Sequence, residues 1–160
     1  MENPTKPYHI RELSREIRLA PTSIKLHIRQ LEKENLVKRE KVGIYKAYKA
    51  NLENENFRFY KKILNIIALH ESGLVKELEK TSPDAITLFG SYARGEDTET
   101  SDIDIFLITR EKPINVRKYE GKLRRKVQLF FSEDLNTLPT ELFNNIMNGI
   151  LLSGFIRWKT

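Results

Sequence analysis

Apolar residues near the start of the chain recur with the period of two short helices. Three apolar residues share one face in each helix: Ile10, Leu13 and Ile17 in the first, and Ile24, Ile28 and Leu31 in the second. Leu19-Ala20-Pro21 interrupts the period and predicts a tight turn between them. Pro21 suits the first turn of the second helix because its missing N–H costs nothing there, and Thr22 and Ser23 can offer oxygens to the other unpaired donors.

Two β-prone runs follow the second helix. Asn35 suits a left-handed cap that ends the helix. The runs cover residues 36–41 and 44–49, are separated by Val42-Gly43, and carry several Lys and Arg residues. The first third of the chain is therefore predicted to fold as helix, turn, helix and basic hairpin.

The middle of the chain again has a helical pattern. From Asn54 to His70 the apolar residues form one broad stripe: Phe57, Tyr60, Ile63, Leu64, Ile66 and Ile67. We expect this stripe to be buried as core, with a homodimer interface as the alternative. A second short helix is expected from Gly73 to Lys80, with Ser72 as its N-cap and Pro83 beyond its end. Residues 53–82 are interpreted as connecting helices.

After Pro83 the pattern changes to short apolar strands. Strands are predicted over 85–89, 101–108 and 126–131. We expect an amphipathic helix from Leu142 to Leu152 and a final strand over residues 155–158.

Two polar elements flank these strands in a pattern suited to phosphate and metal. The first strand runs into Gly90-Ser91, where glycine allows close backbone approach and a helix beginning at Ser91 would present unpaired N–H groups to phosphate. After ten further residues come Asp102 and Asp104, which project from one face of a strand about 6 to 7 Å apart. Paired carboxylates in an apolar strand repel each other, and hard divalent ions with substrate phosphates relieve that repulsion. The alternative to a metal site is that Asp102, Ile103 and Asp104 belong to a half-exposed edge strand.

The segment LFGSYARGEDTETSDIDIFLI closely resembles the minimal nucleotidyltransferase branch of the DNA polymerase β superfamily. The resemblance continues more weakly through residues 126–131 and 148–155, so that it covers about half of the chain, residues 85–158. It implies an α+β domain over residues 83–160, with a mixed β-sheet flanked by helices. It also implies transfer of a nucleoside monophosphate from an NTP, expected to be ATP, to an acceptor hydroxyl, which can be on a partner protein. The roles implied by the resemblance are nucleotide binding by Gly90, Ser91 and Arg94, and catalysis and Mg²⁺ binding by Asp102 and Asp104.

Two Mg²⁺ ions are expected, with Mn²⁺ as a substitute. For Arg94 an ion pair with Glu96 or Asp97 is the alternative to phosphate contact.

One position departs from the family's pattern. The third carboxylate normally comes from the adjacent strand, and the matching position here is Gln128. Glutamine cannot act as a base near neutral pH, so nucleotide binding should survive this change better than turnover. Glu133 and Asp134 follow that strand and are candidates for a replacement carboxylate. Whether the protein is an active enzyme is therefore left open.

The N-terminal segment resembles the winged helix-turn-helix family, which implies a DNA-binding domain over residues 1–52. The helix that usually precedes the pair is absent, so a later helix must supply that wall or the domain is incomplete. Expected base contacts are Thr22, Ser23, Lys25 and Arg29, and expected phosphate contacts are Lys38, Arg39, Lys41 and Lys46. The alternative is a helix-turn-helix used for protein contact.

The charge distribution is consistent with a polyanion-binding first third. Residues 1–50 contain 12 Lys and Arg against 6 Asp and Glu, whereas residues 51–160 contain 16 of each. The stretch 117–126 is also basic and is interpreted as a solvated loop or a contact for triphosphate or an acidic partner. With no cysteine and three scattered histidines, a zinc site is not expected. No signal peptide or membrane span is apparent, so we expect a cytoplasmic protein.

Three functions are therefore compared. The first is a metal-dependent nucleotidyltransferase coupled to a DNA-binding module. The second is a DNA-binding transcriptional regulator or antitoxin whose weakened transferase domain senses nucleotide, which Gln128 favours. The third is a protein-interaction scaffold, supported only by the apolar stripe between Phe57 and Ile67.

Overall fold

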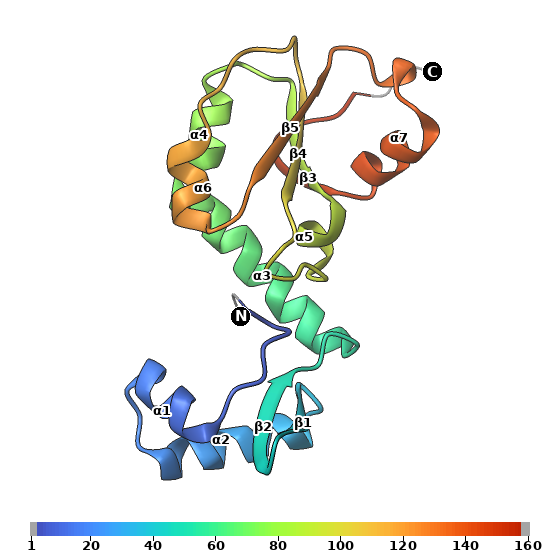
Figure 1. The fold of residues 1–160 in the computed structure, drawn as a ribbon. Helices are drawn as coiled ribbons and strands as arrows, with labels where there is room; N and C mark the ends of the chain where they lie inside the picture. Colours follow the sequence, from blue (N-terminus) through green and yellow to red (C-terminus); the bar gives the residue numbers. More distant parts are fainter. Residues whose placement is uncertain (1–2, 158–160) are drawn as a thin grey trace. The chain divides into compact units, whose positions relative to one another are not determined.

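The structure, a computed structural model, describes residues 3–157 and divides into two compact units. These are Met1–Tyr60 and Lys61–Thr160, so the division falls inside the helix α3 (Glu55–Ser72). The secondary structure of both units is drawn in Figure 1. Within residues 3–157, no helix combines the length and the apolar character that crossing a bilayer requires.

The N-terminal unit contains the predicted order of two helices and a hairpin. Its elements are α1 (Ile10–Ile17), α2 (Pro21–Lys33), β1 (Val37–Val42) and β2 (Tyr45–Ala50). Pro21 begins α2 and Asn35 has a φ of +57°, as expected for the cap after its end. The predicted capping by Thr22 and Ser23 is wrong. The N-cap residue is Ala20, whose side chain has no oxygen, and Thr22 and Ser23 already lie within the first turn of α2.

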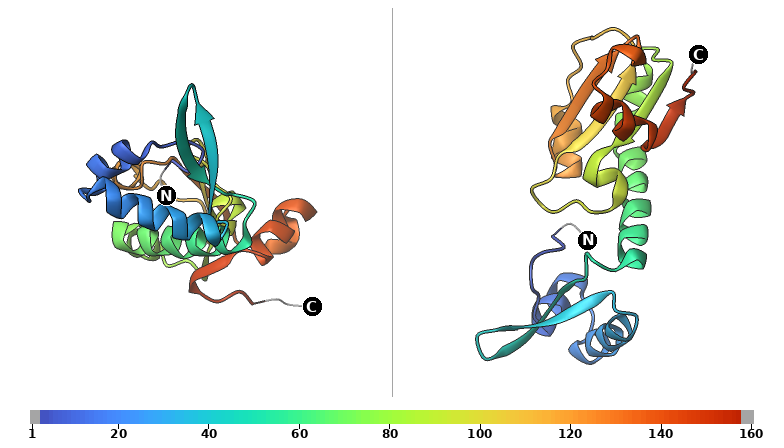
Figure 2. Two further views of the ribbon diagram at one scale, coloured as in Figure 1. Left: turned by 90° about the horizontal axis from the view of Figure 1, so that it is seen from below. Right: turned by 90° about the vertical axis from the view of Figure 1, so that its right-hand side faces the viewer.

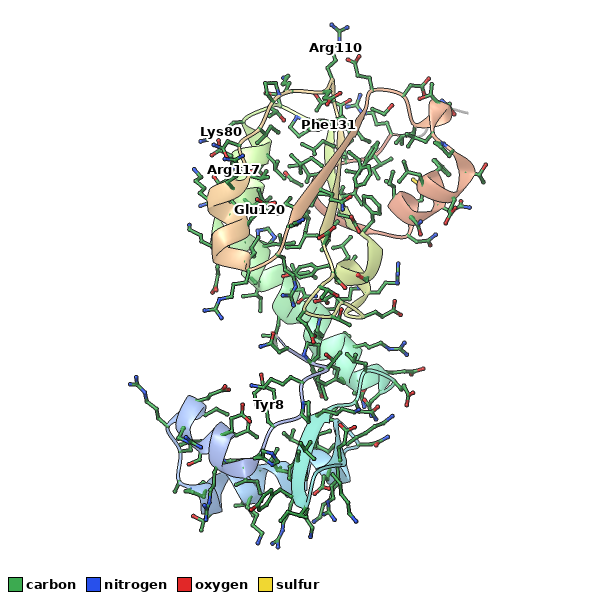
Figure 3. The ribbon with its side chains drawn as sticks, viewed as in Figure 1. Tyr8, Lys80, Arg110, Arg117, Glu120 and Phe131 are labelled. Carbon is green, nitrogen blue, oxygen red and sulfur yellow. The ribbon has the colours of Figure 1, made fainter. Side chains whose placement is uncertain are left out.

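A small apolar core holds this unit together. It consists of Ile24, Ile28 and Tyr48, with Ile10, Leu13 and Leu31 packed against them. Tyr8, labelled in Figure 3, forms an antiparallel bridge with Tyr48 through backbone hydrogen bonds of 2.8 and 2.9 Å. Phe57 and Tyr60 line an apolar cavity of about 450 Å³ beside Ile28. The start of α3 is therefore a later helix that lines this cavity.

The buried face of α3 differs from the prediction. Phe57 is buried, but the next buried positions are Lys61, Asn65 and Leu69. The expected core residues are instead between 39% and 47% exposed: Tyr60, Ile63, Leu64 and Ile67. The apolar period misidentified the inner face because Lys61 and Asn65 find polar partners inside the protein, as described below.

The C-terminal unit is built on a mixed four-stranded sheet (Figure 2). The strands are β3 (Ala85–Phe89), β4 (Ile103–Ile108), β5 (Val127–Ser132) and β6 (Ile150–Gly154). Their spatial order is β5-β4-β3-β6, with β4 and β5 parallel and both other pairs antiparallel. The sheet and its helices thus form an α+β domain.

Helices cover both faces of this sheet. On one face, α4 (Leu74–Glu79) and α6 (Arg117–Leu123) pack with α3 against alternating residues such as Ile103 and Ile105. On the other face, α7 (Thr140–Met147) and the 3-10 turn η1 (Leu135–Thr137) pack against residues such as Phe106. Figure 1 shows α7 on the side of the sheet opposite α4 and α6. Because side chains alternate along a strand, Asp104 lies on the α7 face.

Several predictions at the C-terminus are corrected. The helix expected from Leu142 to Leu152 corresponds to α7, which ends at Met147, and residues 150–154 form β6 instead. A Cβ at Gly149 would come within 2.6 Å of the Leu88 carbonyl oxygen, so the chain turns against β3 there and pairs with it. The strand expected over 155–158 is not formed by residues 155–157, and Trp158 lies outside the described residues.

The junction before α4 also differs slightly from the prediction. Gly73 occupies the N-cap position expected for Ser72, and its φ of +83° suits glycine. Ser72 still contributes, since its Oγ accepts a hydrogen bond from the N–H of Leu74 at 3.1 Å.

Candidate active site

The Gly90-Ser91 turn lies directly against Asp104. The short helix α5 (Gly90–Arg94) follows β3 without a linker and begins one residue earlier than expected. Phe89 is opposite Asp104 in the antiparallel β3–β4 pair. Gly90 has a φ of +74°, and a Cβ there would overlap the Asp104 carboxylate. With five residues, α5 is too short for its macrodipole to matter, so the donors available to phosphate are individual backbone N–H groups.

Asp102 and Asp104 lie at the start of a central strand. Asp102 immediately precedes β4 and Asp104 is its second residue. The alternative of an edge strand is wrong, because β4 is paired on both sides. Burial raises the pKa of Asp104, the negative charge of Asp102 raises it further, and Arg94 opposes both effects. This pair is therefore a local concentration of negative charge that a cation would stabilise.

Gln128 occupies the strand position expected for a third carboxylate. In the parallel β4–β5 pair it stands opposite Asp104, and its Nε2 donates a hydrogen bond to Asp102 Oδ2 at 2.5 Å. The side chain thus orients Asp102 by donating to it. Its amide cannot accept a proton near neutral pH.

Arg94 is engaged in the ion pair that was the alternative to phosphate contact. Its Nε lies 2.7 Å from Glu96 Oε2, and both side chains are partly exposed. The guanidinium also favours the ionised form of Asp104, so it acts on the carboxylate pair electrostatically.

The residues present fit divalent cations shared with a substrate. Within residues 3–157, no group of three or more His, Asp or Glu side chains is placed to hold a metal ion. Asp102 and Asp104 supply two carboxylates, and hard ions such as Mg²⁺ commonly complete their coordination with water and phosphate oxygens. Burial and, after it, the charge of Asp102 raise the pKa of Asp104, and such an ion would offset both effects.

Glu133 and Asp134 do not replace the missing carboxylate. Glu133 follows the far end of β5, five residues beyond Gln128, which corresponds to roughly 16 Å of strand. It pairs there with Arg110, whose side chain extends from that end of the sheet in Figure 3. Asp134 caps η1 by accepting from the N–H of Asn136 at 2.9 Å. The suggestion that either residue reaches the site is wrong.

Helix α6, which contains residues 117–123 of the basic stretch 117–126, is separated from the carboxylates by the sheet. Helix α6 packs on the face opposite Asp104 through Tyr119. Lys122 donates to the Ser72 carbonyl oxygen at 2.9 Å, and Lys118 lies 3.8 Å from Glu77. Arg117 and Glu120 mark the position of α6 in Figure 3. These contacts favour a structural role for α6 over triphosphate binding.

The expected DNA contacts lie on the surface of the N-terminal unit. Most of them are exposed and Ser23 and Lys38 are half-buried; the full set is Thr22, Ser23, Lys25, Arg29, Lys38, Arg39, Lys41 and Lys46. Two of these cations are in ion pairs, Lys38 with Glu53 and Arg39 with Glu32. Lys41 and Lys46 face each other across the hairpin.

Sequence reasoning missed one group near the site. Lys61, Asn65 and Asp97 are buried together beside α5. The only signal was the spacing of Lys61 and Asn65 at i and i+4 between Phe57 and Leu69, which places four residues on one helical face.

Comparison with known proteins identifies the class. Residues 73–154, about half of the chain, match the family described as "Polymerase beta, Nucleotidyltransferase", and the chain belongs to this family. Two relatives from Methanocaldococcus jannaschii are both named "Putative protein adenylyltransferase". One is 59% identical over 44 residues, covering 27% of this chain and 44% of the relative. The other is 41% identical over 59 residues, covering 37% of this chain and 65% of the relative.

Substituting Gly90 by alanine should disrupt the site. The added Cβ would overlap the Asp104 carboxylate, and the positive φ should itself cost about 1 kcal/mol. We expect G90A to lose Mg²⁺-ATP binding in calorimetry. The control is G43A, because Gly43 has a φ of +62° but nothing within 4 Å of the added Cβ. Equal nucleotide binding by G90A and wild type would contradict this placement of the turn.

Proposed function

We propose that this protein transfers a nucleoside monophosphate, with ATP as the donor, to a hydroxyl of a partner protein. The observation that carries the proposal is the convergence of Gly90, Asp102 and Asp104 at one end of the sheet. Membership of the nucleotidyltransferase family supports nucleotidyl transfer in general. The names of the two relatives favour adenylyl transfer to protein, although the chain spans only 44% and 65% of their lengths.

Each residue has a definite task in this proposal. Gly90 lets the backbone of the turn approach the triphosphate, and Ser91 contacts its β- and γ-phosphates. Asp102 and Asp104 would hold divalent cations, two Mg²⁺ or Mn²⁺, which when bound neutralise charge on the triphosphate. The acceptor oxygen forms a bond to the α-phosphorus while the bond to pyrophosphate breaks. Because Gln128 cannot take the hydroxyl proton, the proton leaves to solvent or to a base supplied by the acceptor.

A labelling experiment tests this function. The full chain is incubated with each of the four common NTPs labelled at the α-phosphate, with Mg²⁺ or Mn²⁺ and a cell extract. We expect an acceptor to become labelled from ATP and the label to disappear with D102N. Absence of transfer under all of these conditions, together with no heat on mixing the protein with Mg²⁺ and any NTP, would exclude the proposal.

A nucleotide-sensing regulator is the second candidate, favoured by the neutral Gln128 beside Asp104. In this case the N-terminal unit is a winged helix-turn-helix that binds DNA, with α2 in the major groove and the β1–β2 hairpin along the phosphates. DNA affinity should then change when Mg²⁺-ATP is added. Transfer activity at wild-type Gln128 would favour the enzyme over this regulator.

Removing two hairpin lysines should change the salt dependence of DNA binding. Each phosphate contact contributes about 0.9 to the slope of log affinity against log salt. The double variant K41A/K46A is therefore expected to make that slope less steep, reducing its magnitude by roughly 2, for a duplex of arbitrary sequence. The control is K80A, an exposed lysine at the end of α4 that is labelled in Figure 3. Binding that is absent or insensitive to salt in the wild type would rule out this role for the hairpin.

The exposed stripe of α3 is our proposed homodimer interface. Leu64 and Ile67 are 46% and 44% exposed, and apolar residues at this spacing can interlock between helices. If the chain is dimeric in sedimentation velocity, L64E should shift it to a monomer because the new carboxylate would be desolvated at the interface. The matched substitution K62E, on a different side of the same helix, should leave the dimer intact. A dimer unaffected by L64E would exclude this surface.

A further inference from the structure

A buried ion pair joins α3 to the loop that follows α5. Lys61 on α3 pairs with Asp97, and both residues are only 1% exposed. Lysine and aspartate are almost never buried to this degree without a partner. Burial lowers the pKa of Lys61, while Asp97 and, more weakly, Glu99 act to raise it. The same helix leaves Tyr60 and Leu64 exposed, so the fold places charges inside although apolar side chains were available.

A second contact from α3 reaches the same loop and α5 itself. Asn65, one turn beyond Lys61, uses its side-chain amide to donate two hydrogen bonds. One goes to Asp97 Oδ1 at 2.8 Å, and the other goes to the carbonyl oxygen of Tyr92, within α5, at 2.9 Å. Both bonds are buried, so breaking either leaves a polar group without water. Helix α3 therefore holds both α5 and the loop behind it.

Asp97 stands between the two halves of the candidate active site. Before it, α5 leads back to Gly90-Ser91, and after it the loop reaches Asp102 in five residues. Between them, Thr98 and Ser101 form a tight turn. Thr98 N–H donates to Ser101 Oγ at 3.0 Å, and Ser101 N–H donates to the Thr98 carbonyl oxygen at 3.2 Å. Because this turn is short and hydrogen-bonded, a displacement of Asp97 would also displace Asp102.

A buried ion pair is poor evidence of a need for stability. Well-packed apolar residues of similar volume often serve as well or better, and one established use of such a pair is to select a single geometry. Here the geometry selected is that of the connection between the Gly-Ser turn and Asp102.

We propose that Asp97, held by Lys61 and Asn65, is a positioning residue that sets the placement of Gly90-Ser91 relative to Asp102 for binding of Mg²⁺-ATP. This inference rests on the proposed function, because it takes those residues to be the nucleotide and metal ligands.

Two double variants separate positioning from stability. K61M/D97N removes both charges but keeps an oxygen at residue 97 that can accept from Asn65. K61M/D97L removes both charges and that oxygen as well. Each variant removes both charges of the pair and leaves one buried donor group without its partner, the new amide N–H group of residue 97 in K61M/D97N and one N–H of Asn65 in K61M/D97L. Thermal melting of the full chain should therefore be similar for the two. We expect calorimetry to give Mg²⁺-ATP affinity within about threefold of wild type for K61M/D97N, and at least about tenfold weaker for K61M/D97L.

Hydrogen exchange supplies a readout that does not require nucleotide. Amides of residues 95–102 should exchange faster in K61M/D97L than in K61M/D97N, while the amides of β3 and β4 stay equally protected. The control pair is R110Q/E133Q, which removes an exposed ion pair at the other end of the sheet and should change neither measurement.

The outcomes distinguish this inference from the proposed function. Equal nucleotide affinity and equal loop exchange in the two double variants would overturn the positioning role. If the wild type binds no nucleotide, the proposed function fails, and the positioning role in nucleotide binding fails with it. Loop exchange would then report only whether Asp97 holds the loop. Weaker binding with faster loop exchange in K61M/D97L alone supports the role.

Discussion

Replacing Asp104 by asparagine should abolish nucleotidyl transfer without weakening the fold. The carboxylate lies against the Gly90 turn and beside Asp102, so asparagine keeps its shape but removes half of the paired negative charge. Charge stabilisation by a metal site is worth several kcal/mol, which corresponds to a loss of roughly 10³-fold or more in transfer rate. The measurement is the rate of labelling of the acceptor from α-labelled ATP.

The stability of the same variant provides a second test. Because the pKa of Asp104 is raised in the fold, its ionised form opposes folding at neutral pH, and this cost disappears at acid pH, below the unfolded value. D104N without metal should thus melt at the same temperature as wild type or higher. The control is D84N, which alters an exposed aspartate before β3, at the opposite end of that strand. Transfer by D104N at the wild-type rate would remove Asp104 from the proposed site.

Restoring a carboxylate at position 128 should increase transfer. Glutamate has the shape of glutamine, and the strand register already places Gln128 opposite Asp104. A positioned general base contributes typically 10² to 10⁴-fold, so we expect Q128E to transfer about 10²-fold faster than wild type. Steady-state labelling at several pH values measures this gain.

The metal dependence of Q128E should change at the same time. The wild-type amide donates to Asp102 Oδ2, whereas a carboxylate there would repel it. Without metal, Q128E should melt at a lower temperature than wild type, and Mg²⁺ should raise its melting temperature by more. The control Q128M removes the hydrogen bond without adding charge. It should show neither the faster transfer nor the larger rise in melting temperature with Mg²⁺. A Q128E protein that binds Mg²⁺-ATP yet transfers no faster would show that the neutral residue is not what limits turnover.

The main features of the candidate site could be predicted from the sequence because they depend on local rules. The ten-residue interval between Ser91 and Asp102, and the alternation that puts Asp102 and Asp104 on one face, are properties of a strand, a turn and a strand. The position of Gln128 was expected from the resemblance to the family, and the parallel register places it opposite Asp104. The suggestion that Glu133 replaces the missing carboxylate was wrong. Glu133 is close to Gln128 in sequence, but the length of β5 places it at the other end of the sheet.

The sequence by itself determined the two helices and hairpin of the N-terminal unit, the strands β3, β4 and β5, and the residue types at the site. Only the tertiary structure decided which face of α3 is buried, because that choice depends on whether Lys61 and Asn65 find partners on a distant segment. It also decided that residues 150–154 pair with β3 as a strand, since the close approach of Gly149 to Leu88 is a non-local contact. The hydrophobic pattern of the sequence reports only the average hydrophobicity of each face of a helix or strand, whereas the burial of a charge depends on one specific partner.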